Sequence, residues 1–209
     1  MARNTGAVCR LCRREGMKLF LKGERCYMAK CPVEQGRPAP GMHGQRRRGK
    51  ESDYGRQLRE KQRLRRAYGL SETQFRLFFQ RAARKGGLTG EILLQMLEMR
   101  LDNLVYRLGF SASRPGARQF VLHGHATVDG QRATIPSMIC RTGAVLGVED
   151  KSGIREMIAP SMDAAEARGI SPWLSLDKQN AKGEILHCPT RDEIAPIVNE
   201  QLIVELYSK

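Results

Sequence analysis

Four cysteines near the start of the chain constrain its fold more than any other sequence feature. Cys9 and Cys12 are separated by two residues, and after a spacer of thirteen residues Cys26 and Cys31 are separated by four. Two close thiol pairs joined by a short loop suit one tetrahedral metal ion. We therefore predict a metal-bound knuckle with one structural Zn²⁺, and an iron–sulfur cluster is the alternative that the spacing leaves open.

Positive charge is concentrated at the same end of the chain. Residues 1–66 contain 19 Lys and Arg and 6 Asp and Glu, whereas residues 67–209 contain 17 and 16. A basic first third joined to a nearly neutral remainder is typical of a nucleic-acid-binding arm on a globular body. No stretch approaches the roughly 20 apolar residues of a membrane span, so we expect no membrane partner. We also expect a reducing compartment, in which clustered cysteines favour metal over disulfides.

Capping residues and apolar periodicity predict four helices in the first 125 residues. Ser52 and Ser71 are suited to cap the first two. Thr89 is suited to cap the third, in which apolar residues recur at helical spacing as far as Leu108. Ser113 is suited to cap the fourth. The predicted helices cover residues 53–68, 72–85, 89–108 and 114–123.

The second half of the chain has the signals of an antiparallel sheet. Asp129 and Gly130 stand between two short alternating runs, which indicates a tight hairpin. A helix is expected to be interrupted or restarted near Pro160. The isolated Cys140 and Cys188 are predicted to be buried thiols. Further strands are predicted at residues 144–148, 172–177 and 183–188, a helix at 152–168, and a strand or a docked extension at the apolar tail, 200–209.

Together these patterns predict an α+β fold with three parts. It would combine the metal-bound N-terminal knuckle, a helical domain, and a small domain with helices and antiparallel strands. The predicted parts are a basic knuckle and arm at residues 1–45, the helical domain at 46–97, on which 190–209 could dock, and a small RNA-binding domain at 98–189.

Candidate RNA-binding residues form two groups. The helix predicted at 53–68 has six cations offset only by Asp53 and Glu60, which favours a helix lying against phosphates. In the second group, Arg107, Arg114 and Arg118 are spaced to fall near one exposed edge with His123. The first group is Arg10, Arg13, Arg14, Lys22, Arg46, Arg47, Arg48, Arg56, Arg59, Lys61, Arg63, Arg65 and Arg66. The second group is Asn103, Arg107, Ser113, Arg114, Arg118 and His123.

The run RLDNLVYRLGF, followed by SRPGARQ and HGHATVDG, resembles the RNA-binding domain named after the fourth protein of the small ribosomal subunit. With CRLCRREG, LKGERC and IVNEQL, the whole chain is similar to that ribosomal protein family in its bacterial four-cysteine, zinc-binding form. The resemblance implies a cytoplasmic constituent of the 30S subunit that binds 16S ribosomal RNA and nucleates assembly of the subunit body. It also implies contact with the neighbouring fifth protein, an influence on translational accuracy, and a place near messenger RNA. The small domain would be an inserted small domain of helices packed on an antiparallel sheet.

The chain departs from this family pattern in the short helix. Pro115 and Gly116 stand where the family has an Arg-Gln-like pair, and Leu122 replaces a usual Arg, so the cation contacts expected at those places are absent. Two other functions are weighed against the ribosomal one. An RNA-modifying enzyme, such as a pseudouridine synthase, would need a catalytic motif that we do not find, and no small-molecule substrate is expected. A zinc-dependent DNA-binding regulator is compatible with the knuckle alone.

Overall fold

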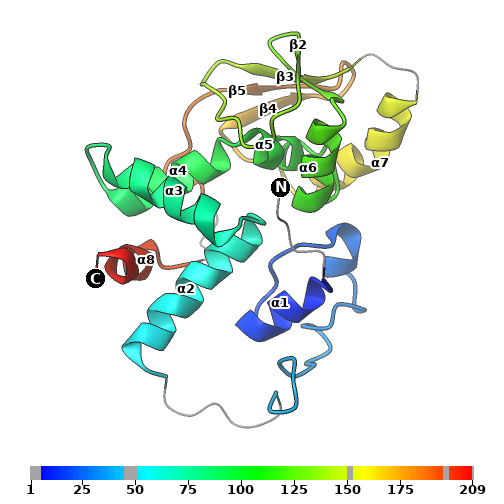
Figure 1. Ribbon diagram of the computed structural model, residues 1–209. Helices are drawn as coiled ribbons and strands as arrows, with labels where there is room; N and C mark the ends of the chain where they lie inside the picture. Colours follow the sequence, from blue (N-terminus) through cyan, green and yellow to red (C-terminus); the bar gives the residue numbers. More distant parts are fainter. Residues whose placement is uncertain (1–5, 45–50, 150–152, 195–197, 209) are drawn as a thin grey trace. The chain divides into compact units, whose positions relative to one another are not determined.

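The computed structural model describes residues 6–44, 51–149, 153–194 and 198–208 (Figure 1). Backbone contacts divide the chain into two compact units, Met1–Ile92 with Pro196–Lys209, and Leu93–Ala195. The predicted α+β class is confirmed, because helices make up the described elements of the first unit and an antiparallel sheet lies in the second. Among the described residues, no helix is long and apolar enough to cross a membrane. The three-part division stays a prediction.

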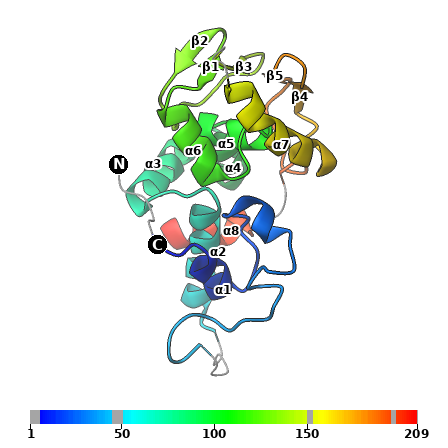
Figure 2. The same ribbon diagram turned by 90° about the vertical axis from the view of Figure 1, so that its right-hand side faces the viewer.

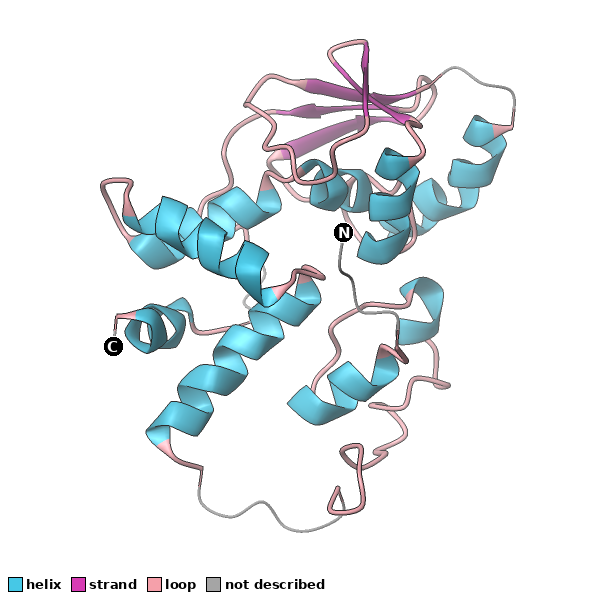
Figure 3. Cartoon of the chain, viewed as in Figure 1, coloured by secondary structure: helices cyan, strands magenta, loops and turns pink. Residues whose placement is uncertain are grey.

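Two helices of the first unit, which is mainly helical in Figure 3, begin directly after their predicted capping residues, Ser52 and Ser71. The amide of Gly55 donates to Ser52 Oγ at 3.1 Å, and the amide of Gln74 donates to Ser71 Oγ at 3.3 Å. These bonds satisfy amides that a helix start leaves without partners. The elements are α1 (Cys9–Glu15), the 3₁₀ helix η1 (Gly23–Cys26), α2 (Asp53–Ala67), α3 (Glu72–Ala83), the beginning of α4 (Thr89–Glu98), and α8 (Glu200–Tyr207).

The apolar tail forms the helix α8, which docks beside α2 (Figures 1 and 2). Gln57 Nε2 donates to the Glu205 carboxylate at 2.9 Å. The rings of Phe79 and Tyr207 stack with centroids 4.5 Å apart. The sequence left open whether this tail forms a strand or a docked extension, and the structure shows a docked helix. The C-terminal segment therefore belongs to the first unit.

The prediction of one continuous helix at residues 89–108 is wrong. It is broken into α4 and α5 (Leu101–Arg107), because Arg100 has an extended backbone with φ −71° and ψ 139°. The amides of Leu101 and Cys140 bond to the carbonyls of Met138 and Met99, at 2.8 and 3.0 Å. These bonds to another segment replace intrahelical ones. The apolar spacing continues across the break, so the periodicity conceals it.

The second unit contains a five-stranded antiparallel sheet with the strand order β2-β1-β3-β5-β4. Asp129 and Gly130 have φ values of 51° and 79°, which form the predicted tight hairpin between the first two strands. The strand bounds are β1 (Ala126–Val128), β2 (Gln131–Ala133), β3 (Val145–Val148), β4 (Leu174–Asp177) and β5 (Lys182–Ile185).

Helices α5, α6 (Arg114–Leu122) and α7 (Ile154–Ala167) cover one face of this sheet (Figures 1 and 2). The interruption predicted near Pro160 is wrong, because α7 continues through this exposed residue. Ile158 and Met162, each 2% exposed, hold both halves of α7 against one core. Cys140 is buried as predicted, whereas Cys188 is exposed, which corrects the prediction for that thiol.

Candidate nucleic-acid interface

The four cysteines lie on α1, on η1 and just beyond it. Cys9 and Cys12 are one helical turn apart on α1, Cys26 ends η1, and Cys12, Cys26 and Cys31 are buried. The amide of Lys22 donates to Cys26 Sγ at 3.4 Å. Burial raises the pKa of the Cys12 and Cys26 thiols, and the neighbouring cysteines raise it further. The thiols are therefore close enough to interact electrostatically.

The structure does not show the predicted metal-bound knuckle, which stays a prediction. Within the described residues, no group of three or more His, Cys, Asp or Glu side chains is arranged to hold a metal ion. Apolar packing contributes to the stability of this segment, since Leu19 and Leu21 are 2% and 6% exposed. Cys12, Cys26 and Cys31 contribute to this small core as buried side chains.

The buried carboxylate of Glu15 connects α1 to α2. Its side chain is fully buried, and Arg59 Nη1 donates to Glu15 Oε1 at 3.1 Å. Arg66 forms an ion pair with the same oxygen, and Arg63 Nε lies 3.9 Å from Oε2. Arg63 also pairs with Glu60. Three predicted RNA-binding arginines of α2 are thus fixed by one acidic residue of the knuckle.

A second carboxylate, that of Glu72, pairs with two other cations of α2. Lys61 Nζ lies 2.6 Å from Glu72 Oε1, and Arg65 Nε lies 3.5 Å from Glu72 Oε2. The Tyr207 hydroxyl donates to Glu72 at 2.9 Å. Burial raises the pKa of Glu72, but the hydrogen bonds from Lys61 and Tyr207 outweigh that effect, and the pKa falls below its ordinary value. Lys61 is itself only 7% exposed, so it contributes to packing as well as charge.

Other predicted cations of the first unit face solvent. Arg56 is exposed and 4.0 Å from the exposed Asp53, a separation that gives little stabilisation. Arg10, Arg14 and Lys22 are also exposed. The predicted residues Arg46, Arg47 and Arg48 lie outside the described residues.

In the second unit, the predicted residues are joined by the buried Glu98. Arg107 forms two bonds to this carboxylate, at 2.6 and 3.1 Å. Asn103 Nδ2 donates to the same carboxylate at 2.6 Å, and Arg114 Nε donates to Asn103 Oδ1 at 2.8 Å. Arg114 is only 8% exposed, which corrects the expectation that it lies on an exposed edge. Asn103 positions the two arginines from inside the unit.

Asp102 anchors a second pair of arginines. Arg100 forms two bonds to its carboxylate, at 3.0 and 2.7 Å, and Arg118 Nη1 lies 3.2 Å from Asp102 Oδ2. The Arg118 side chain keeps 15% of its area exposed, and that of Arg107 keeps 21%. These two cations are held at the surface by buried acids, which fixes their guanidinium groups before any ligand arrives.

The remaining predicted residues lie at the two ends of α6. Ser113 Oγ accepts from the amide of Gly116 at 3.3 Å and caps the helix. His123 is exposed beyond the other end, with Nε2 2.5 Å from the Gln119 amide nitrogen. The departures from the family pattern keep the helix intact, with Pro115 in its first turn and the exposed Leu122 as its last residue.

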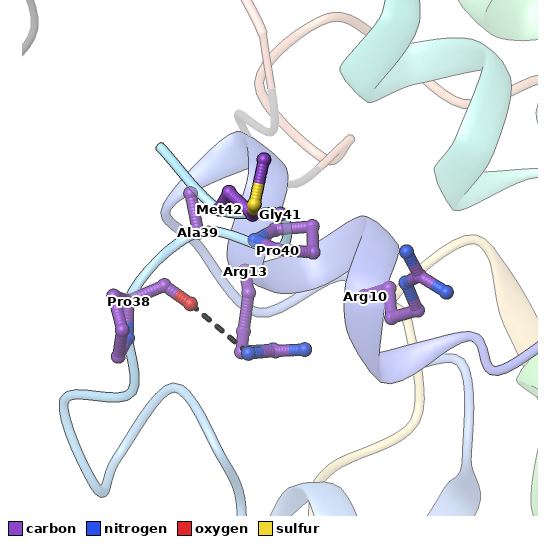
Figure 4. A pocket seen from close by; sticks show the side chains of 7 residues that line it. All are labelled: Arg10, Arg13, Pro38, Ala39, Pro40, Gly41 and Met42. Atoms are coloured by element: carbon purple, nitrogen blue, oxygen red, sulfur yellow. Dashed lines mark hydrogen bonds between the residues drawn. The ribbon is translucent and has the colours of Figure 1, made fainter. Parts of the chain in front are cut away.

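A loop after the cysteines lies along α1 and forms an open pocket of about 510 Å³ (Figure 4). Arg13 Nη1 donates to the Pro38 carbonyl at 3.1 Å and ties this loop to the helix. A second pocket of about 270 Å³ lies beside Cys9 and includes Arg25 and Arg37, which sequence reasoning missed. The signal was present, since Arg25 is adjacent to Cys26. The first pocket is lined by Arg10, Arg13, Pro38, Ala39, Pro40, Gly41 and Met42.

Comparisons with known proteins match the chain from end to end. The family described as "Ribosomal protein S4/S9 N-terminal domain" matches residues 3–98, and the "S4 domain" matches residues 99–146. The small ribosomal subunit protein uS4 of Thermus thermophilus is 53% identical over 209 residues, 100% of both chains. The proteins of the same name from Acidithiobacillus ferrooxidans and Geotalea uraniireducens are each 55% identical, also over 100% of both chains.

Proposed function

The chain belongs to the family of small ribosomal subunit protein uS4, and we propose that the cations held on α1, α2, α5 and α6 are the means by which it binds 16S ribosomal RNA. It is a structural protein of the small ribosomal subunit in the cytoplasm and not an enzyme. The observation that carries the proposal is that cations on these helices outnumber the acids that pair with them. Glu15 alone is shared by Arg59, Arg63 and Arg66, so pairing leaves a net positive surface.

Ribosomal RNA suits this arrangement because it is a polyanion with a fixed shape. Arginines held by buried acids lose little conformational freedom when they meet phosphates. Each phosphate that a cation neutralises also releases condensed counterions, so affinity falls as salt rises. The strongly basic first third supplies charge, and the ordered arginines of both units supply positions that match a folded RNA.

Salt dependence tests the mechanism directly. We expect the dissociation constant for the 5′ domain of 16S ribosomal RNA to rise steeply between 50 and 200 mM salt, in the range of roughly 10³-fold for about six phosphate contacts. Duplex DNA of equal charge is the control for shape. Binding the RNA fragment at least about tenfold more tightly supports recognition of RNA structure, whereas equal affinity favours the DNA-binding alternative. A flat salt dependence would contradict the electrostatic mechanism.

We also propose that Cys9, Cys12, Cys26 and Cys31 bind one structural Zn²⁺. The support is their chemistry and placement: four thiols in two close pairs, three of them buried, with an amide donating to Cys26 Sγ. When bound, the ion would replace the thiol protons and tie α1 to η1. Burial and the neighbouring cysteines raise the pKa of Cys12 and Cys26, so the bound ion itself would have to displace the protons, and four thiolates would complete a tetrahedral site.

Metal analysis of purified ribosomes that contain this chain tests the zinc proposal. We expect one zinc per chain beyond the amount in matched ribosomes carrying Cys12→Ser and Cys26→Ser. Broad visible absorbance together with iron would instead indicate the iron–sulfur alternative. No difference in either metal between the two ribosome preparations would overturn the proposal.

The finer contacts within the subunit are proposals that rest on the family resemblance. We expect the protein to help nucleate assembly of the 30S body, to contact the neighbouring fifth protein, and to lie near messenger RNA with an effect on accuracy. Crosslinking from single introduced cysteines in assembled subunits tests the two contacts. Crosslinks that reach neither the fifth protein nor messenger RNA would contradict them.

A further inference from the structure

The pocket beside Cys9 has an unusual lining. Its volume is about 270 Å³, and its walls come from α1, from the η1 region and from the turn that follows Cys31. Its lining residues, all of them described, include five cations and no acidic side chain. The cations are Arg10, Arg13, Lys22, Arg25 and Arg37.

We propose that this pocket is a phosphate-binding site that holds one backbone phosphate of the bound RNA. The inference rests on the proposed function and deepens it, because it assigns the RNA backbone to a defined place. Two residues outside the predicted interface, Arg25 and Arg37, become RNA-binding residues. The loop pocket in Figure 4 shares Arg10 and Arg13 with this site but has only those two cations.

The cations of the pocket differ from those of α2 in whether they are paired with carboxylates. Arg59, Arg63 and Arg66 already share Glu15, and Lys61 is paired with Glu72. Within the described segments, by contrast, Arg10, Lys22, Arg25 and Arg37 have no carboxylate partner. Cations gathered around one concavity repel one another and raise the local potential for anions.

Backbone and side-chain bonds hold the walls of the pocket in place. Arg13 donates to the Pro38 carbonyl at 3.1 Å. The amide of Lys22 bonds to Cys26 Sγ at 3.4 Å, and the amide of Arg37 bonds to the Pro32 carbonyl at 3.0 Å. The three segments that carry the cations are therefore ordered without a ligand, which lowers the entropy cost of binding one.

Size and lining chemistry favour a phosphate over a base. A pocket of about 270 Å³ leaves room for a phosphodiester group and a few waters. Guanidinium groups bind phosphate oxygens through two parallel bonds. The uncharged part of the wall comes from Ala7, Val8, Cys9 and Pro32, which offer no aromatic face for stacking a base.

The test compares two double variants of the full-length protein. Arg25→Gln with Arg37→Gln removes two cations from the pocket, and Arg81→Gln with Arg84→Gln removes two exposed cations from the α3 region of the same unit. Affinity for the 5′ domain of 16S ribosomal RNA is measured across salt concentrations. We expect the pocket variant to bind at least about tenfold more weakly than the control variant. Its salt slope should be smaller than the wild-type slope by about 1.

Ethylation interference locates the phosphate. At one RNA position, ethylation should block binding of the wild-type and control proteins, yet have no further effect on the pocket variant. The proposal is overturned if the pocket variant matches the control in affinity and keeps every interference position. Lys22→Gln is measured in parallel and should lose the same position, so altered folding of one variant cannot decide the result.

A titration with inorganic phosphate distinguishes the source of the anion. Chemical-shift changes at Arg25 and Arg37, together with unchanged RNA interference, would indicate a free-anion site and overturn the assignment to RNA. Failure of the broader proposal has a different signature. In that case the wild-type protein itself would show a flat salt dependence, whatever the pocket variant does.

Discussion

Glu15 Oε1 accepts a 3.1 Å bond from Arg59 Nη1, and the Glu15 side chain is fully buried while it does so. This ion pair joins the last residue of α1 to the middle of α2. It also shows why a run of arginines can be ordered in a basic protein. A single acid inside a cluster of cations offsets part of their mutual repulsion and fixes their positions.

Replacing Glu15 with Gln should therefore destabilise the first unit. The change leaves Arg59, Arg63 and Arg66 close together without their shared anion. Because these arginines are partly exposed, we expect a loss of about 2–3 kcal/mol in the free energy of unfolding, below the roughly 3–5 kcal/mol lost when a fully buried pair is broken. Urea denaturation of the full-length protein measures it.

The partly exposed pair of Lys18 and Glu34 provides the control for this substitution. The Glu34 side chain is 52% exposed, so Glu34→Gln should cost less than about 1 kcal/mol. Equal effects of the two substitutions would show that burial of Glu15 has no special role.

The same reasoning predicts that Arg66→Ala lowers stability as well as RNA affinity.

Lowering the pH should weaken the docking of α8, because protonation of Glu72 removes the charge that pairs with Lys61 and accepts from Tyr207. The pKa of Glu72 is lower in the folded protein than its ordinary value of 4.5. Its contribution to stability is therefore complete above the unfolded-state pKa and is lost as the pH falls through the folded-state pKa. Unfolding free energies measured between pH 6 and 3 should fall less steeply for Glu72→Gln than for the wild type. Parallel curves would contradict this role.

Local signals predicted much of the fold, because caps and turns depend on a few adjacent residues. Ser52, Ser71 and Ser113 each cap the helix that the sequence assigned to them. The break at Arg100 was missed because its cause is distant. The amide of Leu101 bonds to the carbonyl of Met138, a partner that helical periodicity cannot reveal.

The candidate interface was predictable in residue type but not in the partners of each residue. A sequence shows that Arg107 and Arg114 are cations, but the pairing with Glu98 and Asn103 requires the break after α4 and the capped start of α6. Glu98 positions Arg107 directly and Arg114 through Asn103, and in the basic first third Glu15 positions arginines of α2. Isolated acids in a basic segment are therefore a useful signal that our sequence reasoning did not use.

Substitution of Asn103 separates a positioning role from a direct RNA contact. Asn103 is 1% exposed and bridges Glu98 and Arg114. Asn103→Ala leaves buried charged partners unsatisfied, so we expect a loss of about 2–3 kcal/mol in unfolding free energy. His123→Ala, at an exposed site, should change stability by less than about 0.5 kcal/mol. A stable Asn103→Ala protein with weaker RNA binding would instead indicate direct contact.

The two isolated cysteines should differ strongly in reactivity. Burial, with a further contribution from Asp129, raises the pKa of Cys140 to about 12, whereas Cys188 is exposed. The thiolate is the reactive form, so iodoacetamide at pH 8 should modify Cys188 at least about a hundredfold faster than Cys140 in the folded protein. Peptide mass spectrometry over time measures both rates, and unfolding in urea should make them similar. Similar rates in the native protein would contradict the buried position of Cys140.

Gly109 should tolerate no side chain, because it lies in the turn after α5, where α7 approaches closely. Its φ is +83°, and a Cβ there would lie 2.5 Å from Ala165 Cβ and 3.1 Å from Met162 Cα. The left-handed backbone alone costs about 1–2 kcal/mol for a residue with a Cβ, and contact with α7 adds to it. We expect Gly109→Ala to lower the unfolding free energy by at least about 2 kcal/mol. Gly130→Ala, with φ +79° and no atom within 4 Å, isolates the backbone cost, so equal losses in thermal denaturation would show that α7 does not press against this turn.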